Sequence, residues 1–222
     1  MPDFFTTQAS QAPELSLLVR ASLLGMLPIL LLLTIRYRDK VAYQRIFQGL
    51  QLVQLVFLYS WYLSDGFPLE ESLPLYHCRI AMFAVLFLPK ASLIKDYLAY
   101  LGIGGAIVAF VYPVFDPFPI WHVTTASFVL GHYALFVNGW LYLLGKQKEE
   151  NLTVLRSLTY SLVINLFLLL VNQLTGGNYG FLAITPLVNS HNIWLNLVLV
   201  TLANLALVAL VQKGQKRLLE LS

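Results

Sequence analysis

Apolar residues are gathered along this chain into seven long runs, which short polar or charged segments separate. The runs cover residues of about 15–35, 46–63, 73–89, 97–115, 121–144, 157–174 and 191–212. A helix needs roughly 20 predominantly apolar residues to cross the hydrocarbon core of a bilayer. The pattern therefore predicts an all-α fold: a polytopic membrane helix bundle with seven transmembrane helices.

The second run is the most polar of the seven, because four glutamines interrupt it: Gln44, Gln48, Gln51 and Gln54. The first three share one face of a helix. We expect this face to point into the bundle, where amides form hydrogen bonds between helices, while the leucines of the run face lipid.

The basic residues give the orientation of the bundle. Twelve of the 14 Lys and Arg residues follow the first, third, fifth and seventh runs, and only Arg20 and Arg79 do not. Lys and Arg are enriched in cytoplasmic loops. We therefore expect the N-terminus outside and the C-terminus in the cytoplasm. The twelve residues are Arg36, Arg38, Lys40, Arg45, Lys90, Lys95, Lys146, Lys148, Arg156, Lys213, Lys216 and Arg217.

Composition supports the membrane assignment and excludes other classes. Hydrophobic residues make up 58% of the chain and charged residues 11%, less than half the share that is usual in soluble domains. The net charge of +3 is spread between the apolar runs, so we expect no nucleic acid as a partner. The predicted organisation is a polar extracytoplasmic tail (1–14), a membrane domain (15–212) and a basic cytoplasmic tail (213–222). The first residues lack the basic start of a cleaved signal peptide.

The segment between the last two runs, residues 175–189, differs from the other connections. It is too apolar for a free loop and too short for another crossing. Irregular backbone at membrane depth must be buried in protein or line a cavity. We therefore expect a re-entrant segment or one that lies on the membrane surface.

All four histidines fall in the outer half of the predicted topology. His122 and His191 begin runs, and we interpret them as interfacial residues. His132 lies about ten residues inside its run, or roughly 15 Å along a helix. A histidine at that depth faces the bundle interior or a wet cavity, either in packing or in function.

The third run opens with three chemically active residues in a row, His77, Cys78 and Arg79. Successive residues of a helix differ by 100° in direction, so the three side chains cannot face one pocket. We expect Cys78 and Arg79 to share a cavity and His77 to point at the interface. A thiol and an imidazole at similar depth form a nucleophile and a base, and this pattern makes Cys78 and His132 the candidate catalytic residues. Arg79 is a candidate anion clamp for a lipid phosphate.

Several amide and aromatic residues are further candidates for the same cavity. Asn165 and Asn172 lie seven residues apart on one helical face, where they can orient a histidine or join helices. Asn178 and Tyr179 in the glycine-rich segment can close the cavity. A zinc site formed by Cys78, His77 and His132 is a weaker reading, because the usual ligand spacing is absent. We expect no metal and no cofactor. The chain has no nucleotide-binding or serine hydrolase motif, so nucleotide-driven transport and serine hydrolase chemistry have no support.

A series of short motifs resembles the YwaF-like family of bacterial integral membrane proteins. The series is SLPLYHC (Ser72 to Cys78), a glycine-rich fourth run that ends in a proline, GHY (Gly131 to Tyr133) and GGNYGFLAITP (Gly176 to Pro186). Eukaryotic relatives of that family are implicated in acyl transfer between phospholipids through a cysteine. The resemblance places Cys78 on the family's cysteine, His132 on its histidine, and Asn178 and Tyr179 on its NY pair. Members often carry a histidine two residues before the cysteine, where this chain has Tyr76.

These observations lead to one principal hypothesis and two alternatives. The principal one is a membrane-embedded acyltransferase or related lipid-modifying enzyme of the extracytoplasmic leaflet. Cys78 forms the thioester, and His132 is general base and acid. Substrate contacts are assigned to Arg79, His77, Tyr76, Asn172, Asn178 and Tyr179. The alternatives are a transporter or receptor-like subunit that binds a small anionic or amphipathic ligand, and a scaffold for a partner membrane protein. Membrane lipids are the expected partners, and a bacterial plasma membrane is the expected location.

Overall fold

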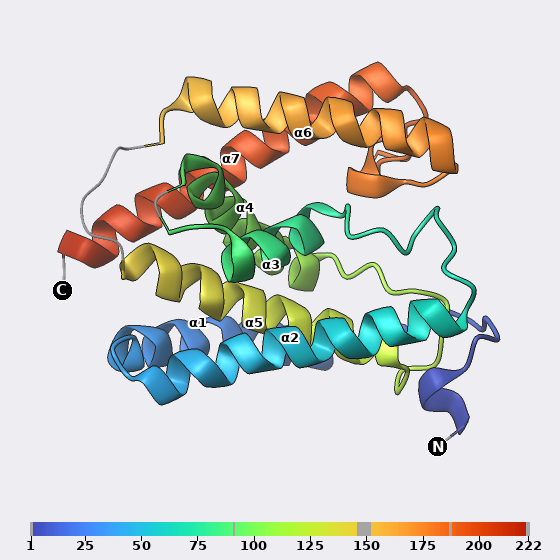
Figure 1. Cartoon of the computed structure of the whole chain (residues 1–222), viewed down its shortest axis with the longest axis horizontal. Helices are drawn as coiled ribbons and strands as arrows, with labels where there is room; N and C mark the ends of the chain where they lie inside the picture. Colours follow the sequence, from blue (N-terminus) through green and yellow to red (C-terminus); the bar gives the residue numbers. More distant parts are fainter. Residues whose placement is uncertain (1, 91, 146–151, 187, 221–222) are drawn as a thin grey trace. The chain divides into compact units, whose positions relative to one another are not determined.

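A computed structural model describes residues 2–90, 92–145, 152–186 and 188–220 of the chain (Figure 1). These residues form an all-helical structure with seven α-helices and two short 3-10 helices, which confirms that the fold is all-α. Lys146 and Lys148, which contribute to the predicted orientation, lie outside the described residues. The elements are η1 (Pro2–Phe5), α1 (Leu17–Tyr37), α2 (Val41–Ser64), α3 (His77–Phe87), α4 (Leu93–Val111), α5 (Val123–Leu144), α6 (Val154–Thr175), η2 (Tyr179–Phe181) and α7 (Ile193–Glu220).

Six of the helices are long and apolar enough to cross a membrane, and α3 is shorter than the sequence predicted. It has 11 residues, which span only about 16 Å at 1.5 Å per residue. The run 73–89 carries Pro74 near its start and Pro89 at its end. A proline disfavours helical backbone at the residue before it, and Leu88 is extended. The prolines thus confine the helix to the middle of the run.

Local capping sets several of the other helix boundaries. The side chains of Ser16 and Thr153 accept hydrogen bonds from backbone N–H groups in the first turns of α1 and α6. His122 does the same for α5. The helix α6 ends at Gly176, whose φ of 76° is left-handed and favours glycine. At the other end of the chain, α7 continues past residue 212 into the segment predicted as a tail.

The chain divides into two compact units, which are described separately. The first unit comprises residues 1–67 and 105–145 and contains α1, α2 and α5. Two side-chain bonds join α2 to α5: Asn138 Nδ2 donates to the Phe47 carbonyl, and Ser127 Oγ donates to the Gln54 carbonyl. The predicted inward face of α2 is correct for Gln51, which is buried, and wrong for Gln48, which is exposed.

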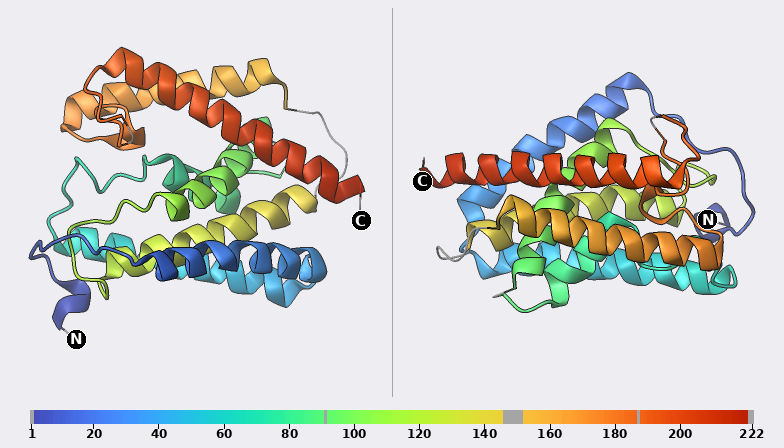
Figure 2. Two further views of the ribbon diagram at one scale, coloured as in Figure 1. Left: turned by 180° about the vertical axis from the view of Figure 1, so that it is seen from behind. Right: turned by 90° about the horizontal axis from the view of Figure 1, so that it is seen from above.

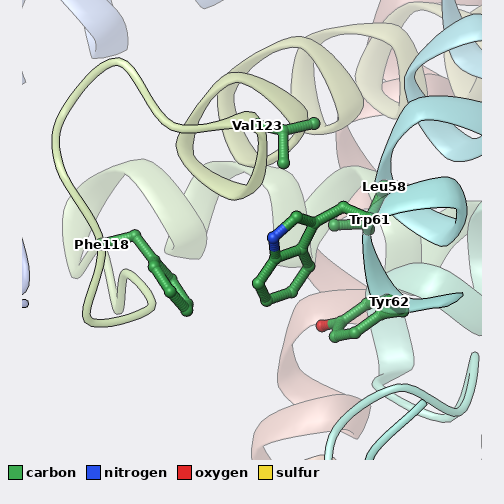
Figure 3. Packing of buried hydrophobic residues seen from close by; sticks show 5 residues of the cluster. All are labelled: Leu58, Trp61, Tyr62, Phe118 and Val123. Atoms are coloured by element: carbon green, nitrogen blue, oxygen red, sulfur yellow. The ribbon is translucent and has the colours of Figure 1, made fainter. Parts of the chain in front are cut away.

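At one end of the first unit, aromatic residues form a buried cluster (Figure 3). Trp61 is 1% exposed, and its ring lies 5.0 Å from that of Phe118 in an edge-on arrangement. Leu58, Tyr62 and Val123 complete the cluster. Such large buried rings contribute most of the apolar area that holds the ends of helices together.

The second unit comprises residues 68–104 and 146–222 and contains α3, most of α4, α6 and α7. The helices α6 and α7 run side by side, and the two views of Figure 2 agree on this. The segment with η2 packs against both through Leu168, Tyr179, Leu182 and Leu197. On another face of α7, Gly104 of α4 lies so close to Leu207 that a Cβ on the glycine would be 2.8 Å from the leucine Cβ.

Candidate functional site

Cys78 lies in the first turn of α3, where Tyr76 is the N-cap residue. Its thiol is partly buried and forms no disulfide. The first backbone N–H groups of a helix have no partner within the helix, and they point toward its N-terminal end. The Tyr76 side chain does not cap these N–H groups. The cysteine therefore stands beside backbone donors of the type that bind an anion or a developing oxyanion.

Arg79 is held close to the same helix start. Its Nη1 donates a hydrogen bond of 3.0 Å to the Glu71 carbonyl, and its guanidinium carbon lies 5.0 Å from the centre of the Tyr76 ring. That ring in turn meets the Tyr179 ring edge-on at 5.2 Å. Arg79 and Tyr76, both predicted as substrate contacts, are thus parts of one packed array around the first turn of α3.

His77 points toward α6 and α7, which corrects the expectation that it faces the interface. Its Nε2 is 2.8 Å from Asn165 Oδ1, and because an amide oxygen only accepts, Nε2 is the donor. Asn165 Nδ2 donates to Thr201 Oγ1 at 3.0 Å, and Asn204 Nδ2 lies 3.4 Å from His77 Nε2. The prediction that His77 faces the interface was wrong because α3 begins only at His77. The side chain therefore leaves the first turn of α3 toward the neighbouring helices.

Gly180 closes the other side of the His77 ring. A Cβ at this position would lie 2.7 Å from His77 Cε1 and 3.2 Å from Nδ1, and its φ of 67° favours glycine. The neutral ring with hydrogen on Nε2 has its lone pair on Nδ1. The glycine-rich segment thus packs its backbone directly against the histidine that precedes Cys78.

The polar cluster extends beyond the residues that the sequence singled out. Tyr97 of α4 and Ser161 of α6 share a hydrogen bond of 2.6 Å, and the Asn204 side chain also interacts with Tyr97. Asn204 and Thr201 were not predicted. In the sequence they stand out only as polar residues inside the apolar run 191–212. The packing of α6 on α7 decides which residues they contact.

Asn172, Asn178 and Tyr179 hold the segment after α6 in place. Asn172 and the Tyr179 backbone exchange two hydrogen bonds, of 2.7 and 3.0 Å. The Tyr179 hydroxyl donates to the Leu69 carbonyl and accepts from the Leu73 N–H. Burial raises the pKa of this hydroxyl, so that it stays protonated and continues to donate. Asn178 Oδ1 accepts from the N–H groups of Ala183 and Ile184.

His132 is buried in α5, in the first unit. Its Nδ1 donates to the Phe128 carbonyl at 2.7 Å, which places the lone pair of the neutral ring on Nε2. The Phe128 and Phe110 rings lie 4.5 and 6.0 Å from it. Cys78 belongs to the second unit, and the pairing of Cys78 with His132 stays a prediction.

His122 is buried too, contrary to its interpretation as an interfacial residue. It is 0% exposed, its ring stacks on Phe118 at 4.3 Å, and its Nε2 donates to the Thr6 carbonyl at 3.0 Å. Trp61 Nε1 donates to the same carbonyl at 3.0 Å. The N-terminal segment, whose position was not predicted, supplies the acceptor that makes burial of the ring favourable.

No cluster of three or more His, Cys, Asp or Glu side chains suited to a metal ion occurs among the described residues.

Comparison with known proteins gives one match. Residues 4–213 match a sequence model of the TMEM164 family, which is a family of transmembrane proteins. No curated protein and no solved structure is significantly similar to the chain.

Proposed function

The chain belongs to the TMEM164 family of transmembrane proteins, and we propose that it is a membrane-embedded acyltransferase that acts on lipids. Cys78 carries the acyl group in this proposal. The observation that supports it most is the position of the thiol in the first turn of α3, next to backbone N–H groups without helical partners. A nucleophile beside such donors has what acyl transfer requires, because the donors stabilise the oxyanion of the tetrahedral intermediate.

The surroundings of α3 support a fixed geometry for this thiol. Three neighbours of Cys78 are anchored: Tyr76 by the Tyr179 ring, His77 by Asn165, and Arg79 by the Glu71 carbonyl. A reacting group displaced by about 1 Å can lose on the order of a hundredfold in rate. The anchors therefore act as positioning residues for Cys78.

The proposed reaction has two steps. A general base removes the thiol proton, and the sulfur attacks the ester carbonyl of a donor lipid. The C–S bond of a thioester forms, the ester C–O bond breaks, and the departing alcohol of the lysolipid takes the proton. The hydroxyl of an acceptor lysolipid then attacks the thioester, gives up its proton, and releases the Cys78 thiol.

His132 keeps the role that the sequence assigned to it, general base and acid. Its tautomer is suited to this role, because Nδ1 is a donor to Phe128 and the lone pair is on Nε2. Arg79 keeps the role of binding the headgroup phosphate, for which a guanidinium is well matched. In this proposal Asn172, Asn178 and Tyr179 are positioning residues, because their hydrogen bonds hold the chain segment after α6.

The predicted topology is part of the same proposal, with seven crossings, the N-terminus outside and the C-terminus in the cytoplasm. A crossing at α3 keeps Lys90 and Lys95 on the side of the basic residues between α1 and α2. In this proposal residues 73–76, which form a turn before α3, complete the crossing, and the Leu73 N–H has a partner in the Tyr179 hydroxyl. A YwaF-like bacterial protein of the plasma membrane fits the motifs, and lipids are its partners.

Mass spectrometry of the purified chain tests the role of Cys78. The protein is incubated with a phospholipid that carries an isotope-labelled acyl chain, with lysophospholipid as acceptor. We expect a labelled acyl adduct on Cys78 that hydroxylamine removes, together with labelled product. In Cys78→Ala both are lost, and in His132→Gln product formation falls by about 10²–10⁴-fold.

Thermal unfolding of each variant serves as the control for folding. Product formation at the normal rate by folded Cys78→Ala overturns the proposal. Binding of lipid by both the natural chain and the variant, without any transfer, favours the transporter or receptor-like alternative.

A further inference from the structure

An apolar groove of about 480 Å³ lies in the first unit, within the size range of small-molecule and cofactor sites. The N-terminal segment forms one wall through Phe4 and Leu15, and α1 forms another through Val19 and Leu23. The start of α5 and the residues before it form the third, with Trp121 among them. The groove thus lies at the predicted outer ends of α1 and α5.

The wall formed by the N-terminal segment is fixed in place. The Thr6 carbonyl accepts hydrogen bonds from Trp61 and His122, and the Ser10 N–H donates to the Pro117 carbonyl at 2.7 Å. In Figure 2 the N-terminal segment, in dark blue, lies at the same end of the first unit as the yellow-green segment before α5. Three backbone groups and two buried side chains therefore hold this wall of the groove in place.

Two opposite charges accompany this apolar lining. Asp3 lines the groove. Arg20 follows Val19 directly and precedes Leu23 by three residues, so it borders the lining face of α1. Among the described residues, Asp3 and Arg20 form no ion pair with each other. Arg20 is also one of the two basic residues that lie outside the predicted cytoplasmic segments.

We propose that this groove binds a zwitterionic phospholipid whose headgroup carries an ammonium group. An acyl chain occupies the apolar groove, Arg20 binds the phosphate, and Asp3 binds the ammonium. The charge pattern favours this occupant, since phosphatidylglycerol and fatty acids have no cationic group for Asp3. Trp121, which is 81% exposed, lies at the membrane interface beside the headgroup. The inference goes beyond the proposed acyl transfer and does not depend on it.

Native mass spectrometry of the full chain in detergent tests the site. Delipidated protein is titrated with dioleoyl phosphatidylcholine or with dioleoyl phosphatidylglycerol, which lacks an ammonium group. We expect one retained phosphatidylcholine per chain and weaker retention of phosphatidylglycerol. Arg20→Gln should weaken binding of both lipids about tenfold. Asp3→Asn should weaken only phosphatidylcholine, by about threefold, because the pair is exposed.

Matched controls remove charges elsewhere. Lys213→Gln and Glu220→Gln change exposed residues near the end of α7 and should leave lipid retention unchanged. Val19→Trp should block the groove and abolish retention, while thermal unfolding shows that the variant is folded. Equal retention of both lipids, unaffected by Asp3→Asn, Arg20→Gln and Val19→Trp, means that the lipid is merely annular and overturns the proposal.

Discussion

Each unit of the chain contains a histidine ring whose Nε2–H is donated to an oxygen far away in the sequence, but the two partners differ in kind. In the first unit, His122 donates to the backbone carbonyl of Thr6 and is enclosed by Trp61 and Phe118. In the second unit, His77 donates to the side chain of Asn165, within a cluster of amides and hydroxyls. Both rings are at the start of a helix.

The difference between the two sites concerns what each histidine positions. His122 ties a terminal segment to the ends of α2 and α5, and its neighbours are aromatic rings without reactive groups. His77 ties the first turn of α3 to α6, and the next residue is Cys78. A histidine with a backbone partner thus closes the fold, whereas one held by amide side chains fixes a residue that can react.

The largest effect is expected from a substitution in the buried aromatic cluster of the first unit. Trp61→Ala removes a side chain that is 1% exposed and its hydrogen bond to Thr6. We expect a loss of about 3–5 kcal/mol in the free energy of unfolding. Trp194→Ala is the matched control, because Trp194 is 66% exposed and its loss should stay within about 0.5 kcal/mol.

Chemical unfolding in detergent micelles measures both variants. Similar losses for Trp61→Ala and Trp194→Ala would contradict the view that the aromatic cluster closes the first unit.

A smaller effect sharpens the role of His77 in the second unit. Gly180→Ala and Gly176→Ala both place a Cβ on backbone with positive φ, at about 1–2 kcal/mol each. Only the methyl group at residue 180 meets a neighbour, His77 Cε1 at 2.7 Å, whereas nothing lies within 4 Å at residue 176. We expect Gly180→Ala to cost about 1–3 kcal/mol more than Gly176→Ala, and to lower acyl transfer by Cys78 further.

The same unfolding experiment and the acyl transfer assay compare the two variants. If they are equally stable and equally active, the Gly180 backbone does not hold the His77 ring.

The smallest expected effect is a dependence of the unfolding temperature on pH, which arises from His122. Burial lowers the pKa of His122, more than the Thr6 carbonyl, Asp116 and Asp65 raise it. The folded chain therefore resists protonation that the unfolded chain accepts, and stability is lost as the pH falls below the ordinary value of about 6.5. We expect the unfolding temperature to decrease between pH 7 and pH 5.

In His122→Asn this decrease should be smaller, since asparagine also caps a helix but does not titrate in that range. An identical pH profile in the natural chain and in this variant would assign the effect to other groups.

Much of the fold could be predicted from the order of apolar and polar residues. The apolar runs located six long helices, because burying backbone polar groups in lipid requires helices. Five of them agree with the runs within about five residues at each end, whereas α7 extends to Glu220, beyond the predicted end at residue 212. The third run predicted too long a helix, since prolines near both of its ends shorten α3 to His77–Phe87. The site was predicted only in part. Cys78 and Asn165 were noticed, but nothing in the sequence pairs Asn165 with His77.

By itself the sequence determined the membrane class, the helices and the position of one cysteine at the start of a run, because hydropathy and proline act over a few neighbouring residues. The tertiary structure alone decided which polar groups meet. The acceptor of His77 is 88 positions away, and the acceptor of His122 is 116 positions away. Such partners are selected by how helices pack and by the need to satisfy buried hydrogen-bonding groups, and neither depends on sequence distance.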